Sequence, residues 1–148
     1  KDTRFYHCNI KTLNLIPSVM ASEKARVHGV DETVFYRDGG RVTECAHSNV
    51  SIIKDGVFRT APTDCLILPG IARRHLIKAC HALDIPVDES AFYLDDLMNA
   101  DEVIVSSSSN FCLQAVSVDG KPVGGKAPEL LSKLQKWLTD DFENYCKG

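Results

Sequence analysis

The chain has 148 residues, of which 44% are hydrophobic and 25% charged, a composition typical of one globular domain and unlike that of disordered chains. The formal net charge of −3 and the scattered basic residues argue against nucleic acid as a partner. No apolar run approaches the ~20 residues that cross a bilayer, so we expect a cytoplasmic protein with no membrane partner.

Cysteine and histidine spacing predicts neither disulfides nor a metal site. The six cysteines are spread evenly along the chain without a CxxC pair, so we expect reduced thiols, several of them buried. The five histidines form no HxxxH or HExxH pattern, and no metal is therefore expected.

The chain opens with a β-prone segment at residues 4–10, and the pattern then predicts a helix over residues 13–29. Pro17 suits the first turn of this helix, and Thr12 or Asn14 can cap it. Its predicted apolar face consists of Leu15, Ile16, Val19, Met20 and Ala25.

Two hairpins follow. The β-prone runs 32–37 and 41–44 flank an Asp-Gly-Gly turn, and the runs 49–54 and 57–60 flank an Asp-Gly turn. Turns of this composition between two extended runs are strong hairpin signals.

The rest of the chain alternates between strand and helix patterns. The expected elements are an extended run at 65–68, a helix at 71–83 after Pro69-Gly70, a strand at 87–93, a short helix at 94–99, strands at 102–106 and 111–118, and a terminal helix at 128–145. We find no internal repeat and no linker, and therefore expect one mixed α/β domain spanning residues 1–148.

Lys11 is the first candidate for chemistry, because it lies among apolar residues where the β-prone segment gives way to the helix. A lysine held partly out of water has a lowered pKa and becomes a usable nucleophile. The ordinary alternative is a surface lysine at an element boundary.

Glu44 is the second candidate. Alternation along the strand places it on the same face as Val42, so an inward Val42 implies an inward carboxylate that requires a partner. Such a carboxylate is suited to hold a protonated ring nitrogen. The alternative is an exposed glutamate at a strand end.

Two further segments are suited to bind an anion. Gly70 allows a tight turn into the helix at 71–83, whose first free N–H groups can bind a phosphate. The serine run 106–109 offers hydroxyl and amide donors. Each segment taken alone is equally typical of an ordinary helix start or a solvated loop.

In matching order, these four features resemble the class IV (fold-type IV) aminotransferases, which use pyridoxal 5'-phosphate (PLP). The resemblance rests on NIKTLNL at 9–15, VTE at 42–44 followed by SNV at 48–50, LPGI at 68–71, and the serine run. It covers essentially the whole chain and is closest, around Lys11 and Glu44, to the D-amino-acid aminotransferases. It implies the α+β, barrel-like C-terminal domain of that fold and a homodimer with active sites near the subunit interface.

By this resemblance, Lys11 is the Schiff-base lysine and moves the proton between the substrate Cα and the cofactor. Glu44 keeps the pyridine nitrogen protonated, and Leu68 packs on the ring. The phosphate is bound by Gly70, Ile71, Ala72, Ser107, Ser108 and Ser109. Ala72 stands where a threonine is common in the family, so one phosphate hydroxyl is missing.

The resemblance implies transamination of a D-amino acid of the D-alanine type with a 2-oxo acid. Family members carry a smaller preceding domain with a phosphate-binding arginine and the groups that grip the substrate carboxylate. We expect that domain to be absent from this chain, and the chain alone to be inactive. The alternatives are a branched-chain amino acid aminotransferase or an aminodeoxychorismate lyase of the same fold, and a non-catalytic α/β interaction domain.

Overall fold

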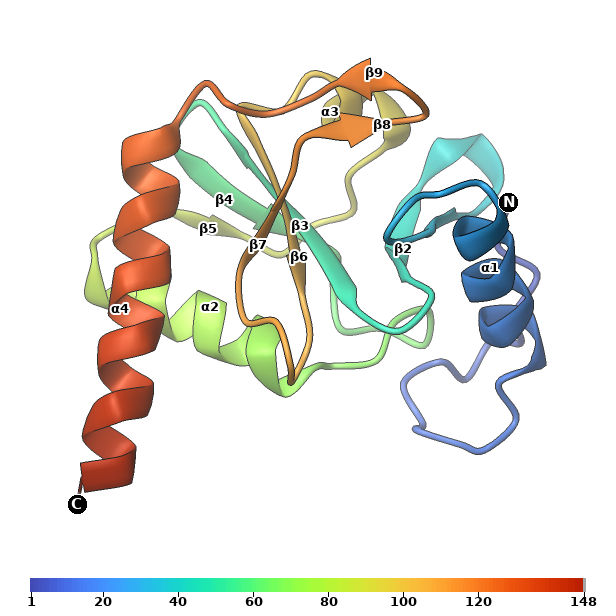
Figure 1. Ribbon diagram of the computed structural model, residues 1–148, viewed down its shortest axis with the longest axis horizontal. Coiled ribbons are helices and arrows are strands. Elements are labelled where there is room, and N and C mark those ends of the chain that lie inside the picture. Colours follow the sequence, from blue (N-terminus) through green and yellow to red (C-terminus); the bar gives the residue numbers. More distant parts are fainter. Residues whose placement is uncertain (148) are drawn as a thin grey trace.

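The structure is a computed structural model that describes residues 1–147, in which helices and strands are mixed along the chain as predicted (Figure 1). The helices are α1 (Ile16–Val27), α2 (Ile71–Ala82), α3 (Leu94–Met98) and α4 (Pro128–Lys147). The strands are β1 (Val34–Tyr36), β2 (Val42–Cys45), β3 (Asn49–Lys54), β4 (Val57–Thr60), β5 (Val87–Asp88), β6 (Glu102–Ser106), β7 (Leu113–Ala115), β8 (Ser117–Val118) and β9 (Lys121–Pro122).

A five-stranded sheet with the order β5-β4-β3-β6-β7 forms the centre of the fold. Its neighbouring strands are antiparallel, except for the parallel pair β4 and β5. Both predicted hairpins form, β1 with β2 and β3 with β4. In the second hairpin, Asp55 and Gly56 both have positive φ, of 50° and 77°, as a two-residue turn between twisted strands requires.

Alternation along the central strands divides the core into two clusters. On β3, Ile52 packs with Phe92 and Leu97 on one face of the sheet, whereas Ile53 packs on the other face against residues of α2 and α4. Figure 1 shows α2 and α4 side by side over that second face. The start of α2 is thereby held at the edge of the sheet where β3 begins and β6 ends.

The N-terminal helix differs from its prediction. It begins at Ile16, no side chain caps it, and the Thr12 hydroxyl instead accepts a hydrogen bond from the Asn14 N–H. Of the predicted apolar face, only Ala25 is buried, while Ile16, Val19 and Met20 are each more than 60% exposed. Apolar spacing predicted the helix correctly, but it did not show that most of the apolar face of the helix is exposed in this structure.

Two other expectations were wrong. Residues 65–67 form turns and a bend instead of an extended run, because Asp64 accepts a hydrogen bond from the Leu66 N–H and folds the chain locally. The predicted strand 87–93 is reduced to β5 and to an isolated bridge between Arg41 and Tyr93. No helix within residues 1–147 is long and apolar enough to cross a bilayer.

Candidate functional site

A cavity of about 640 Å³ lies between the N-terminal segment, the turn after β2, the start of α2 and the end of β6. Its volume falls within the range of ~300 to 1,000 Å³ typical of small-molecule sites. It brings together every predicted site residue except Ser109: Lys11, Glu44, Leu68, Gly70, Ile71, Ala72, Ser107 and Ser108 line it. Residues from four distant parts of the sequence thus meet in one place.

Glu44 on β2 is 5% exposed, so the predicted burial of its carboxylate is confirmed, although both faces of this strand are buried. Its Oε1 accepts a hydrogen bond from Arg4 Nη1 at 2.5 Å. Its Oε2 accepts two more, from Asn49 Nδ2 at 3.1 Å and from the Leu68 N–H at 3.0 Å. The three donors fix the orientation of the carboxylate at the cavity wall.

Burial raises the pKa of the Glu44 carboxyl, and the Arg4 guanidinium and the Leu68 N–H, which both favour the ionised form, offset that rise only in part. A carboxylate of raised basicity holds a shared proton more strongly than an ordinary glutamate does. Glu44 is therefore suited to accept a hydrogen bond from a protonated ring nitrogen in the cavity.

The sequence prediction missed Arg4, the cationic partner of Glu44. Its side chain is 9% exposed, it also pairs with Asp2 at 2.9 Å, and its guanidinium lies over the Phe35 ring at 4.5 Å from the centroid. Asp2 in turn pairs with Arg37 at 3.2 Å. The available signal was the i, i+2 spacing of an acid and a base at positions 2 and 4, which places both on one face of an extended segment.

Lys11 lines the cavity from the irregular segment that precedes α1. Its side chain is exposed, so the expectation of a partly desolvated lysine was wrong for this chain. The reason is local, because the neighbouring Ile10 and Leu13 are also exposed and no strand packs over the segment. No other group among the described residues forms an ion pair or hydrogen bond with the Lys11 amine, which leaves it available to a ligand.

The start of α2 has the uncapped first turn that the predicted anion-binding role requires. Gly70 has an extended backbone conformation at the N-cap, and no side chain caps the first turn of the helix. The N–H groups of Ile71 and Ala72 are therefore not occupied by a capping side chain at the point where the helix dipole favours an anion.

The serine run contributes unequally to the cavity. Ser107 and Ser108 line it, whereas Ser109 does not, and its hydroxyl lies 3.2 Å from that of Ser107. Ser106, the first residue of the predicted serine run, also lines the cavity, and its buried Oγ has no hydrogen-bond partner among the described residues. A buried hydroxyl without a partner at a cavity wall is a free donor for a ligand.

The cavity thus offers an amine at one side, an ionisable acid at another and N–H and hydroxyl donors at a third. This set matches the aldehyde, the ring nitrogen and the phosphate of PLP.

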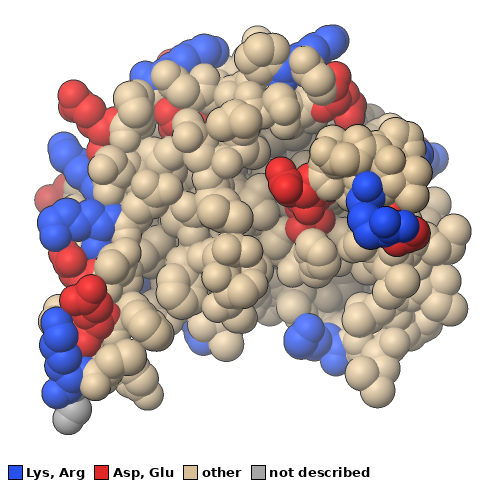
Figure 2. All heavy atoms as spheres, in the orientation of Figure 1, with Lys and Arg blue, Asp and Glu red and all other residues tan. Residues whose placement is uncertain are grey.

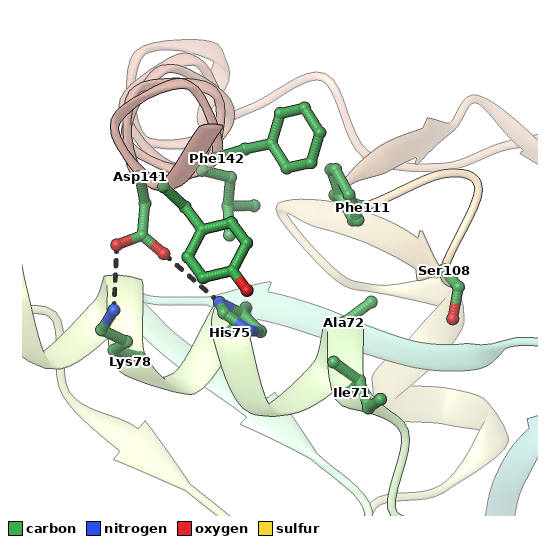
Figure 3. A pocket seen from close by; sticks show the side chains of 10 residues that line it. Ile71, Ala72, His75, Lys78, Ser108, Phe111, Asp141 and Phe142 are labelled. Carbon is green, nitrogen blue, oxygen red and sulfur yellow. Dashed lines mark hydrogen bonds and ion pairs between the residues drawn. The ribbon is translucent and has the colours of Figure 1, made fainter. Parts of the chain in front are cut away.

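A second cavity of about 370 Å³ lies between α2 and α4 and shares Ile71, Ala72 and Ser108 with the first. Figure 3 shows that three of its polar side chains are paired with one another, since Asp141 binds Lys78 at 2.9 Å and His75 at 3.4 Å. With Asp141, Lys78 and His75 already paired, this groove offers a ligand less chemistry than the cavity of Lys11 and Glu44.

Comparison with known proteins gives one family match. The profile of the family described as "Amino-transferase class IV" matches residues 1–118. The chain is 40% identical over 147 residues to a D-alanine aminotransferase of Listeria monocytogenes serotype 4b (strain F2365), a match that covers 99% of this chain and 50% of the relative. The chain therefore spans about half the length of the curated relatives it matches.

Solved structures agree with this match. A putative 4-amino-4-deoxychorismate lyase of Legionella pneumophila subsp. pneumophila str. Philadelphia 1 superposes with a TM-score of 0.84 at 26% identity, over 90% of this chain and 49% of that one. A T.th. branched-chain amino acid aminotransferase with pyridoxamine 5'-phosphate superposes with a TM-score of 0.76 at 26% identity, over 84% of this chain and 42% of that one.

Proposed function

Because this chain belongs to the class IV aminotransferases, we propose that it forms the cofactor-binding half of a PLP-dependent enzyme that transaminates D-amino acids with 2-oxo acids. The observation that carries this proposal is the gathering of Lys11, Glu44 and the start of α2 around one cavity. The 40% identity to D-alanine aminotransferases supports a substrate of the D-alanine type.

In this proposal, Lys11 holds the cofactor covalently through its amine, and Leu68 packs on the ring. The phosphate is held by the N–H groups of Ile71 and Ala72 and by the hydroxyls of Ser107 and Ser108, whereas the predicted Gly70 N–H already donates to the Leu68 carbonyl oxygen at 2.8 Å. Ser109, which lies outside the cavity lining, is left out of this set. When bound, PLP supplies an electron sink for the charge that develops at the substrate Cα.

The residues of the chain move and hold the protons. Once the substrate amine has displaced it, the Lys11 amine removes the proton from the substrate Cα as general base and later returns a proton on the cofactor side. Glu44, fixed by Arg4, Asn49 and the Leu68 N–H, holds a proton at the ring nitrogen and so keeps the ring able to accept charge.

The remaining half of the active site is proposed to come from other parts of the protein. A smaller preceding domain would supply an arginine for the phosphate and the groups that bind the substrate carboxylate, and without it this chain would be inactive. The exposure of Lys11 supports an active site shared between this chain and another domain, because one side of the cavity is open to solvent.

We further propose a homodimer in which a second subunit covers α1 and its preceding segment. Leu13 is 99% exposed, and Ile16, Val19 and Met20 form an apolar surface beside it. Figure 2 shows largely uncharged atoms at this end of the molecule, interrupted by one group of charged side chains, while charged side chains line the edge along α4. Sedimentation of the intact protein tests this, because Val19→Asp combined with Met20→Asp should convert the dimer to a monomer.

A cytoplasmic location remains part of the proposal. All six cysteines are free thiols, and burial raises the pKa of Cys8, Cys45, Cys80 and Cys112. Unpaired thiols in this number support a reducing compartment.

The test of function is a turnover assay of the intact protein with PLP and a 2-oxo acid. We expect turnover of D-alanine and its loss, by about 10²- to 10⁴-fold or more, in Lys11→Ala. Turnover of L-leucine alone would favour a branched-chain aminotransferase, and conversion of aminodeoxychorismate would favour the lyase. If the wild-type protein shows no visible absorbance band after addition of PLP and removal of the unbound cofactor, the non-catalytic interaction domain becomes the better description.

A further inference from the structure

Asn49 is the first residue of β3 and contacts two parts of the proposed cofactor site, the Glu44 carboxylate and the start of α2 at Gly70. It is 5% exposed and lines the cavity. Its Nδ2 donates to Glu44 Oε2 at 3.1 Å and to the Leu68 carbonyl oxygen at 2.9 Å. Because the Leu68 N–H donates to the same Glu44 oxygen at 3.0 Å, the three residues form a closed hydrogen-bonded ring.

The other side of the Asn49 amide faces the start of α2. A Cβ placed on Gly70 would overlap Asn49 Oδ1. Gly70 has φ −62° and ψ 146°, a conformation open to any residue. Glycine is therefore required at this position by the close approach of the Asn49 side chain, and not by backbone geometry.

The hydrogen bonds of Asn49 to Glu44 and Leu68 are linked to its close approach to Gly70. The Asn49 amide cannot turn away from position 70 without breaking its hydrogen bonds to Glu44 and Leu68, since both donors are on the same planar group. Any shift of the α2 start toward β3 therefore displaces the Glu44 carboxylate as well.

We propose that Asn49 is a positioning residue that sets the separation between the acid for the ring nitrogen and the helix start for the phosphate. The inference rests on the proposed function and extends it to a residue that does not itself react. Asn49 matches the length of the cavity to that of the cofactor, so that both ends of one rigid ligand are bound together.

A mutant cycle in the intact protein tests the link, with PLP affinity measured by absorbance titration of the apoprotein. Asn49→Ala should weaken PLP binding about tenfold, which corresponds to the loss of one hydrogen bond to a charged group. Gly70→Ala should weaken it at least as much, because its methyl group displaces Asn49. In the double variant that methyl group enters the vacated space, so PLP should bind about as well as to Asn49→Ala.

Ser51→Ala is the matched control. Ser51 lies on the same face of β3 and is fully buried, but its hydroxyl has no hydrogen-bond partner among the described residues and does not line the cavity. Its replacement should leave the PLP dissociation constant unchanged. Asn49→Leu separates donation from packing, because it keeps the approximate size of the side chain, loses both N–H donors and adds no charge, and it should weaken PLP binding as Asn49→Ala does.

The same four proteins can be compared without PLP by thermal unfolding. Gly70→Ala should lower the midpoint temperature of unfolding when residue 49 is Asn, and should lower it much less when residue 49 is Ala. Equal lowering in both backgrounds, or wild-type PLP affinity in both Asn49 variants, overturns the inference while leaving the proposed function standing. Failure of the wild-type protein to bind PLP overturns the proposed function together with the inference.

Discussion

The two sides of the cavity are built differently. On the side of the sheet, Glu44 and Asn49 are buried and their polar atoms are held by hydrogen bonds from Arg4 and to Leu68. On the opposite side, Lys11 lies exposed in an irregular segment, and the described residues form no bond with its amine.

This difference separates two tasks of a cofactor site. A carboxylate that must hold one protonation state benefits from a rigid, desolvated environment, whereas an amine that must leave and rejoin a ligand needs freedom to move. The sheet side is part of the folding core, so its mutations should reduce stability. The lysine side should carry reactivity with little contribution to folding.

The largest stability effect is expected for Arg4→Leu. This change leaves Asp2 and Glu44 buried without their shared cation, and removing one partner of a buried ion pair costs about 3–5 kcal/mol. Urea unfolding measures the loss. Arg26→Leu is the control, because Arg26 and its partner Glu23 are exposed, and its free energy of unfolding should not change. A small effect of Arg4→Leu would show that the sheet side is not held by this network.

A pH-dependent effect is expected for Asp2→Asn. Burial opposes ionisation of Asp2, but hydrogen bonds from Arg4 outweigh it and lower the pKa below the ordinary 3.8. The ionised carboxylate therefore stabilises the fold at neutral pH, and this contribution is lost as pH falls through the folded-state pKa. Wild type should be more stable than Asp2→Asn at pH 7, and the difference should begin to close below pH 3.8.

Because the charge of Asp2 is one of the causes that raise the pKa of Glu44, the same comparison in a Glu44→Gln background isolates the contribution of Asp2. Unfolding by urea at a series of pH values gives the difference directly. A difference that stays constant from pH 7 to below the pKa would contradict the assigned role of the Asp2 carboxylate.

The smallest effect on stability is expected for Lys11→Ala. The side chain is exposed and bonded to no described residue, so the free energy of unfolding of the protein without PLP should change by less than about 0.5 kcal/mol. Thermal unfolding of the apoprotein measures it. A loss comparable to that of Arg4→Leu would mean that both sides of the cavity belong to the core.

Local signals predicted much of this arrangement. The Asp-Gly turn predicted the second hairpin, and Pro69-Gly70 marked the start of α2. The spacing of Glu44 and Val42 predicted a buried carboxylate but not that β2 is buried on both faces. Each of these depends on neighbours a few residues away, which a sequence displays directly.

The features of the site that the sequence did not predict depend on contacts between residues far apart in the chain. Arg4 and Glu44 are 40 residues apart, and Asn49 meets the Leu68 carbonyl 19 residues later, so no local pattern indicates either contact. Apolar spacing in α1 identified a helix without showing that its apolar side is uncovered in this chain. The exclusion of Ser109 from the cavity likewise depends on the path of the loop after β6.

The most direct test is to identify the residue that carries the cofactor. Borohydride reduction of the intact protein with bound PLP, followed by peptide mass analysis, should place the pyridoxyl group on Lys11 and leave Lys11→Ala unlabelled. A label on another lysine, or no label in a protein that binds PLP, would contradict the assignment of this cavity.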